Sequence, residues 1–265
     1  MEHPIFQKIE TSKKVDFGDV LSRCVELYKK VWQQGAAHVL ITAIAAIPLI
    51  GLIYGPFIYY TFQQEKARSA YYMSDYSMDY VSTGPSVMAI VILAVLIVVA
   101  AFLLQVVSAG VSAHFYKVCR AVDMETGEDT KDYFEFFRGK QLKRLLLFGL
   151  TSSGIAFLAL ALCYLPIFYA LVPLQLMVPI FAFNKDMTVS EIVKAAFKLG
   201  NKHWIYVFGF YIIASNVAQL GVILCFVGVI FTACIVYLPV YYFYKSTIGF
   251  EGISENNNEP QALSQ

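Results

Sequence analysis

The chain has 265 residues, of which 58% are hydrophobic and only 15% charged, with a net charge of +1 and a mean hydropathy of +0.60. Soluble domains average about 25% charged residues, so this composition excludes an ordinary soluble protein and predicts that lipid is the solvent. Charged residues are absent from four long windows, a segregation typical of membrane-spanning helices. These windows are 31–64, 80–116, 145–184 and 203–244.

The N-terminal region is predicted to hold a tail and one amphipathic helix. Residues 1–15 are polar, and we expect a loose tail there. From Phe17 to Trp32 apolar residues recur at the spacing of one helix face, with charged residues between them, so 17–32 is a predicted amphipathic helix. We interpret it as a helix lying on the membrane surface. The alternative is an ordinary helix packed on cytoplasmic loops.

Six membrane spans are predicted from the charge-free windows, which makes the fold class an all-α polytopic bundle within a single membrane domain, residues 16–250. A helix needs about 20 apolar residues to cross the hydrocarbon core. The division of the last window near residue 220 is one choice, and a division near Gly228 fits almost as well. The spans are placed at about 36–62, 87–116, 145–165, 166–183, 204–220 and 222–244.

Prolines and glycines predict local features within these spans. Pro48 and Pro56 in the first span predict kinks, and the three prolines of span 166–183 predict an irregular helix. Gly51 and Gly55 are expected to let a neighbouring helix of the same bundle approach closely. The tyrosine-rich connector 63–85 is interpreted as a belt at the membrane interface, with a ligand- or partner-binding lid as the alternative.

Two further amphipathic segments are predicted on the charged side, at 130–144 and 188–202. Thr188 and Glu191 have the spacing of a capping box, in which each side chain satisfies a backbone amide of the other, so a helix is expected to start there. Residues 251–265 have the composition of a disordered tail.

Positive charge is divided unequally between the two sides. Eighteen of the 20 Lys and Arg residues precede the first span, follow the last or lie in 117–144 and 185–202, and two lie in the first connector. Cytoplasmic loops carry this excess in membrane proteins, so both termini are predicted to be cytoplasmic. A shift of 172 residues aligns Trp32 with Trp204 and suggests a repeated unit of one amphipathic helix and two spans.

Two stretches of the sequence resemble a known family. They are Phe17-Gly-Asp-Val-Leu21 and Val178-Pro-Ile-Phe-Ala-Phe-Asn-Lys-Asp-Met-Thr-Val-Ser-Glu-Ile-Val-Lys-Ala-Ala-Phe-Lys-Leu-Gly200, the latter followed by Lys-His-Trp204. Together they resemble the bacterial six-helix membrane proteins of the YciC type, and the membrane domain fused to some glycerophosphodiester phosphodiesterases, over most of residues 16–248. The resemblance implies a protein of the bacterial cytoplasmic (inner) membrane. It implies no phosphodiesterase activity, because the soluble barrel has no counterpart here.

Candidate binding residues are uncharged, because no Asp, Glu, Lys or Arg lies within a predicted span. Amide side chains offer hydrogen-bond donors and acceptors without a charge, and we expect them to contact a lipid headgroup or a small solute. The alternative is interhelical hydrogen bonding, worth about 0.6–2 kcal/mol each. Trp32 and Trp204 are predicted membrane-interface anchors. The candidate amides are Gln105, Gln175, Asn216 and Gln219.

These patterns favour a non-enzymatic membrane protein that binds lipid or organises membrane partners. We expect no catalytic residue, cofactor or metal, since the histidines lack defined ligand spacing, and no nucleic-acid partner, since the basic residues are interleaved with acids. The expected partners are membrane lipids and other membrane proteins. The alternative function is a transporter or channel for a neutral or lipidic solute. A membrane-embedded enzyme ranks third, because no positioned acid or base is seen.

Overall fold

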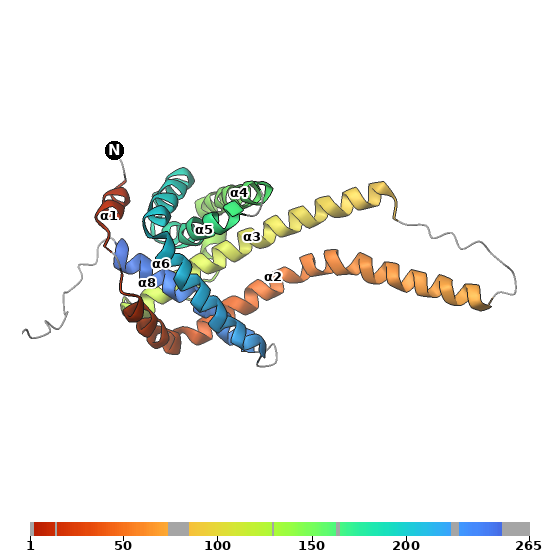
Figure 1. Ribbon diagram of the computed structural model, residues 1–265, viewed down its shortest axis with the longest axis horizontal. Coiled ribbons are helices and arrows are strands. Elements are labelled where there is room, and N and C mark those ends of the chain that lie inside the picture. The colour runs from red at the N-terminus through yellow and green to blue at the C-terminus, as the bar shows by residue number, and fades with distance from the viewer. Residues whose placement is uncertain are drawn as a thin grey trace, which may run out of the picture.

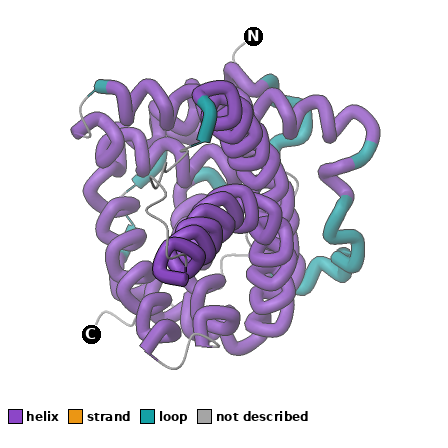
Figure 2. Tube along the Cα trace, turned by 90° about the vertical axis from the view of Figure 1, so that its right-hand side faces the viewer, coloured by secondary structure: helices purple, strands orange, loops and turns teal. Residues whose placement is uncertain are grey.

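The computed structural model describes residues 3–13, 15–73, 85–128, 130–162, 165–223 and 228–250, and within them every regular element is a helix (Figures 1 and 2). Six of the described helical stretches are long and apolar enough to cross a membrane, which confirms the all-α fold class. The elements are α1 (Ile5–Thr11), α2 (Phe17–Met73), α3 (Val87–Asp123), η1 (Glu135–Phe137), α4 (Gly139–Ala161), α5 (Leu165–Phe183), α6 (Val189–Ile223), α7 (Gly228–Thr232), η2 (Ala233–Val236) and α8 (Tyr237–Thr247).

The molecule has a packed end and an arm. The arm consists of residues 44–66 of α2 and 87–103 of α3, which extend side by side away from the other helices in Figure 1. Its large apolar side chains are exposed, and the most apolar window of α3 has no buried residue. The packed end comprises α1, η1, α4–α7, η2, α8 and the adjoining ends of α2 and α3. Buried residues of α3 begin only at Val106.

The predicted amphipathic segment 17–32 is the beginning of α2 and continues into the first span without a break. Its apolar stripe is buried by the protein itself, with Val20, Cys24 and Val31 all in the core. The helix packs on α7, η2 and α8, and the Tyr28 hydroxyl donates a hydrogen bond of 3.2 Å to the Phe231 carbonyl. The surface-helix interpretation is therefore wrong, because the face that would enter the membrane interface is covered.

The outer half of α2 departs from expectation at its glycines. A Cβ atom added at Gly51 or Gly55 would meet nothing within 4 Å, so no described helix packs on this pair. Pro48 and Pro56 lie inside the helix, which changes direction along its length in Figure 1. The first part of the tyrosine-rich connector continues α2 as far as Met73, and residues 74–84 lie outside the described ranges.

The described part of residues 1–15 is not the loose tail that was predicted. Residues 5–11 form α1, which packs on α6 and buries Ile5, Phe6 and Ile9. Lys202 of α6 donates hydrogen bonds to the carbonyls of Ile9 and Glu10, at 2.8 and 2.6 Å. The apolar residues at i, i+1 and i+4 were the available signal for this short helix.

Helix α5 is continuous where an irregular span was expected, although Pro173 and Pro179 lie inside it. Pro173 faces Gly200 of α6, where an added Cβ would come within 3.2 Å of the proline Cγ atom. The small residue on one helix thus accommodates the proline ring of the other. The preceding helix α4 begins at Gly139, so the predicted amphipathic segment 130–144 is divided between a loop with η1 and the first turn of α4.

The predicted capping box at the start of α6 is confirmed. The Thr188 amide donates to Glu191 Oε2 at 2.8 Å, and the Glu191 amide donates to Thr188 Oγ1 at 3.4 Å. The amphipathic segment 188–202 and the span that follows form one helix with a kink at His203, where φ is −125°. The kink falls at the predicted boundary between them.

The last span begins at Gly228 and not at residue 222, so the later of the two divisions is the correct one. It starts with α7, tightens into the 3-10 turn η2 and ends as α8. Residues 224–227 and the tail 251–265 lie outside the described ranges.

The charged segments come together at the packed end. Asp123, the last residue of α3, accepts hydrogen bonds from the hydroxyls of Tyr241 and Tyr242, both at 2.8 Å. It also pairs with Lys245 at 2.7 Å. The Arg144 guanidinium donates to the carbonyls of Asn184 and Met187 beyond the end of α5. These contacts bring the charged segments together, and the side of the membrane on which they lie stays a prediction.

Candidate functional site

A groove of about 550 Å³ lies between α2 and α3 where the arm joins the packed end, and the last span closes its inner end. The residues on its α2 side recur every three or four positions and so lie on one face of that helix. The residues on its α3 side have the same spacing. The lining residues are His38, Val39, Thr42, Ala43, Ala46 and Leu49 of α2, Ala101, Leu104, Gln105 and Ser108 of α3, and Ala233 and Tyr237.

Small side chains keep the two helices from filling this space. Ala43 and Ala46 on α2 face the groove, and Ala101 and Ser108 line it from α3. Large side chains at these positions would interdigitate, as they do in closely packed interiors. The groove is therefore encoded by small residues at helical spacing along two neighbouring spans.

The inner end of the groove is polar. His38 is 2% exposed, and its Nδ1 atom has no hydrogen-bond partner within the described residues. The ring is held by Tyr237, with ring centroids 5.0 Å apart, and by Phe115, at 5.4 Å. A buried polar atom without a partner costs free energy, and Nδ1 is itself enclosed by protein, so His38 contributes to the wall of the groove without presenting a free nitrogen to it.

Gln105 lies midway along the groove. Its side chain is exposed, and its amide makes no hydrogen bond within the described part of the chain. The Thr42 hydroxyl, on the facing helix, donates to the carbonyl of His38 at 3.0 Å and is thereby satisfied. The free donors and acceptors of the groove among the described residues therefore lie at Gln105 and Ser108.

The two ends of the groove differ in polarity. Helices α2 and α3 run in opposite directions (Figure 1), so the first lining residues of α2 lie opposite the last lining residues of α3. His38 and Ser108 lie at the inner end, next to Tyr237, while Leu49 and Ala101 lie at the end toward the arm. From His38 to Leu49 the groove follows α2 for about 16 Å, at 1.5 Å per residue. It thus combines a polar inner end with an apolar outer end.

The other three predicted amides do not join Gln105. Gln175 is half-buried on α5, and Asn216 and Gln219 are exposed on α6. Asn216 donates a hydrogen bond of 2.8 Å to the Ile212 carbonyl of its own helix. None of the three lines the groove. Of the predicted binding residues, the structure therefore places only Gln105 in a candidate site.

The two tryptophans make local contacts at the packed end. Trp32 is 38% exposed, and its ring centroid lies 5.9 Å from that of Phe231. Trp204 follows the kink of α6, donates from Nε1 to the Tyr169 carbonyl at 3.2 Å and stacks on Phe208. Their assignment as interface anchors stays a prediction.

The histidines occupy separate places. His114 approaches Glu135 at 3.5 Å, and His203 Nε2 lies 2.9 Å from the Ser12 hydroxyl. His38 lines the groove alone. Among the residues that the structure describes, no three His, Cys, Asp or Glu side chains form a group able to hold a metal ion.

The sequence analysis did not predict that His38 and Tyr237 line a binding site. His38 stood out only as a histidine near a span end, and Tyr237 as one aromatic residue among many. The usable signal was the run of small residues Ala43 and Ala46 opposite Ala101, since small residues mark close or hollow helix interfaces.

Comparison with known proteins gives this chain no relative. No family model matches it, and neither does any curated protein or solved structure. The resemblance to the YciC type stays a prediction, and the functional argument rests on the groove.

Proposed function

We propose that this protein is a non-enzymatic integral membrane protein of the bacterial envelope that binds a membrane lipid in the groove between α2 and α3. The observation that carries the proposal is the polarity of the groove. An acyl chain fits the apolar end beside Leu49 and Ala101, and a neutral hydrogen-bonding group of the lipid reaches Gln105 and Ser108. Ligand sites commonly combine an apolar lining with a few such polar groups.

The location of the groove supports a lipid as the occupant. Both helices that form it are long enough to span a membrane, and the exposed apolar side chains of the arm adjoin its outer end. A lipid can therefore enter sideways from the bilayer without crossing a polar region. We place the packed end at the cytoplasmic side of the inner membrane, because it carries most of the Lys and Arg residues.

A transporter for a neutral or lipidic solute is the second candidate. It is favoured by the unpaired Gln105 amide within the membrane-spanning part of α3. A transport path would bring several polar groups together, whereas Gln175, Asn216 and Gln219 lie away from the groove. Proteoliposome flux separates the two, since binding alone predicts a retained lipid and no flux of lipid or solute.

The decisive experiment is native mass spectrometry of the protein released from membrane-derived nanodiscs, with identification of the lipid retained. Ala46→Phe fills the groove and should abolish stoichiometric retention, while Gln105→Leu should weaken it by about tenfold, the effect of one lost hydrogen bond to a buried group.

The matched control is Ala94→Phe, because Ala94 is an exposed alanine of α3 outside the groove. This variant should retain the lipid as the unmodified protein does. Equal retention in Ala46→Phe and Ala94→Phe would refute lipid binding in the groove.

A further inference from the structure

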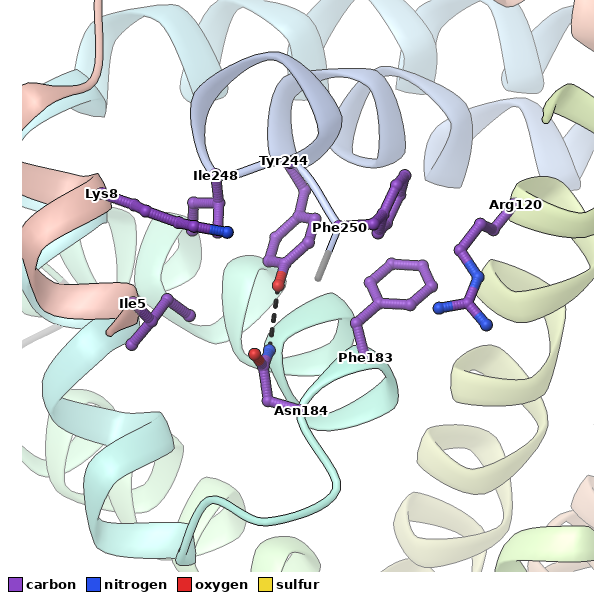
Figure 3. A pocket seen from close by; sticks show the side chains of 9 residues that line it. Ile5, Lys8, Arg120, Phe183, Asn184, Tyr244, Ile248 and Phe250 are labelled. Atoms are coloured by element: carbon purple, nitrogen blue, oxygen red, sulfur yellow. Dashed lines mark hydrogen bonds between the residues drawn. The ribbon is translucent and has the colours of Figure 1, made fainter. Parts of the chain in front are cut away.

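A second cavity, of about 50 Å³, lies at the packed end, where four segments distant in the sequence meet (Figure 3). One water needs about 10–15 Å³, so the space suits a group several times larger. Its walls come from α1, the last turn of α3, the end of α5 and the residues that follow α8. The lining residues are Ile5, Lys8, Arg120, Phe183, Asn184, Tyr244, Ile248, Gly249 and Phe250.

Among the described residues that line this cavity, two have cationic side chains and none is acidic. Lys8 of α1 is half-buried, and its ammonium group has no hydrogen bond or ion pair within the described residues. Figure 3 shows the Lys8 side chain extending past Ile248 toward Tyr244. A half-buried ammonium group is stabilised when its N–H groups find acceptors, which an anion in the cavity would supply.

The Arg120 guanidinium is fixed by an ion pair and two aromatic rings, and some of its N–H groups make no hydrogen bond to a described residue. Its Nη2 atom binds both oxygens of Glu128, at 2.6 and 2.7 Å, and the guanidinium lies 5.4 Å from the ring of Phe183 and 5.6 Å from that of Phe250. Its buried Nε atom has no partner within the described chain. A fixed guanidinium with unused N–H groups is suited to the oxygens of a phosphate.

Neutral groups shape the remaining wall. Asn184 Nδ2 donates to the Tyr244 hydroxyl at 2.9 Å and to the Ile180 carbonyl at 2.8 Å. Figure 3 shows this hydrogen bond bridging the end of α5 and the end of α8. These hydrogen bonds fix the Asn184 amide and give this part of the wall polar groups beside the apolar Ile5, Phe183, Ile248 and Phe250.

We propose that this cavity binds a phosphate group, with Lys8 and Arg120 at opposite sides of it (Figure 3). The group is either the headgroup phosphate of an anionic lipid or free phosphate, since both present the same oxygens. Basic pockets at the ends of membrane helices on the cytoplasmic side are suited to anionic headgroups. The site is separate from the groove, because Arg120 lies about 18 Å farther along α3 than Ser108, at 1.5 Å per residue.

The test titrates three probes into the purified full-length protein in neutral detergent and follows its thermal unfolding. The probes are short-chain phosphatidic acid, the matching diacylglycerol and inorganic phosphate. A ligand that binds the folded state raises the unfolding midpoint with its concentration. We expect such a rise with phosphatidic acid and none with diacylglycerol.

Lys8→Gln should weaken phosphatidic acid binding by about tenfold, as expected for the loss of one charged hydrogen bond, without altering the unliganded midpoint. Lys13→Gln is the matched control, because Lys13 is exposed near the end of α1 and does not line the cavity. Arg120→Lys should also weaken binding, and its own midpoint shows whether it stays folded.

Each probe in this experiment tests a different part of the proposal. Inorganic phosphate that binds with the same dependence on Lys8 would identify free phosphate as sufficient, and binding of phosphatidic acid alone would identify a lipid headgroup. No binding of either, or binding unchanged by Lys8→Gln, would overturn the proposal. Ala46→Phe should leave phosphate binding intact, so the two sites can fail independently.

Discussion

The arm and the packed end are both built from apolar helices, the arm from the more apolar ones, but they are stabilised in different ways. In the arm, Phe62 is 70% exposed, whereas Phe181 in the packed end is fully buried between Phe136 and Phe148. Side chains of the arm face lipid, which solvates them as well as protein would. The packed end depends on close contacts among its own residues. The same residue type therefore has a different energetic role in each region.

The largest expected contrast comes from truncating one phenylalanine in each region. Phe181→Ala should lower the free energy of unfolding by about 4 kcal/mol, because it leaves a cavity among aromatic rings. Phe62→Ala should change it by less than about 0.5 kcal/mol. Chemical denaturation in detergent micelles measures both. Similar losses for the two variants would show that the arm has a packing partner in the folded protein.

A smaller loss of stability is expected when the carboxylate of Asp123, which links α3 to α8, is neutralised. Asp123→Asn should cost about 3 kcal/mol, because Lys245 would lose its carboxylate partner in a largely buried position. Asp19→Asn is the control, since Asp19 pairs with Arg23 at an exposed position worth at most about 1 kcal/mol. An equal response of the two variants to denaturant would argue against a structural role for the Asp123 cluster.

The smallest effect depends on pH and again concerns only the packed end. Burial alone would raise the pKa of Glu135, but the His114 ring 3.5 Å away and the hydrogen bonds of 2.7 Å from Lys117 outweigh it and lower the pKa from 4.5 to about 2. A carboxylate with a lowered pKa stabilises the fold above its unfolded-state pKa, and this stabilisation is lost as the pH falls from about 4.5 toward about 2.

As the pH falls through this range, amide hydrogen exchange should become faster in η1 and the adjoining part of α3 before it becomes faster in the arm. Glu135→Gln should remove that part of the acid response, and Glu26→Gln, at an exposed position of α2, should preserve it. Acid loosening that persists in Glu135→Gln would mean that another group is responsible.

The sequence predicted the elements of this fold better than their contacts. Charge-free windows located the spans, and Thr188 with Glu191 located the start of α6. The surface-helix interpretation failed at Val20 and Val31, because periodicity shows that a face is apolar but not what covers it. Tertiary pairing decided that question, and spans of similar composition carry little information about their neighbours.

The candidate sites were harder to predict for the same reason. Gln105 was expected as a ligand contact because it is polar within a span, and it lies in the groove. His38 and Tyr237 reach the groove from spans almost 200 residues apart, so their proximity has no local signature. Lys8 was assigned to a loose tail, and Arg120 was one basic residue among seven in 117–144. Only the docking of α1 brings these two cations to one cavity.

The contact between the beginning of α2 and the last span has a consequence for biosynthesis. Tyr28 and Phe231 are 203 residues apart in sequence. At about 5–20 residues per second, a ribosome needs on the order of 10–40 s to synthesise the chain between them. During that interval the stripe containing Val20 and Val31 has no final partner and must be shielded by the translocon, a chaperone or the lipid surface. The beginning of the first long helix is thus among the last segments to reach its native contacts.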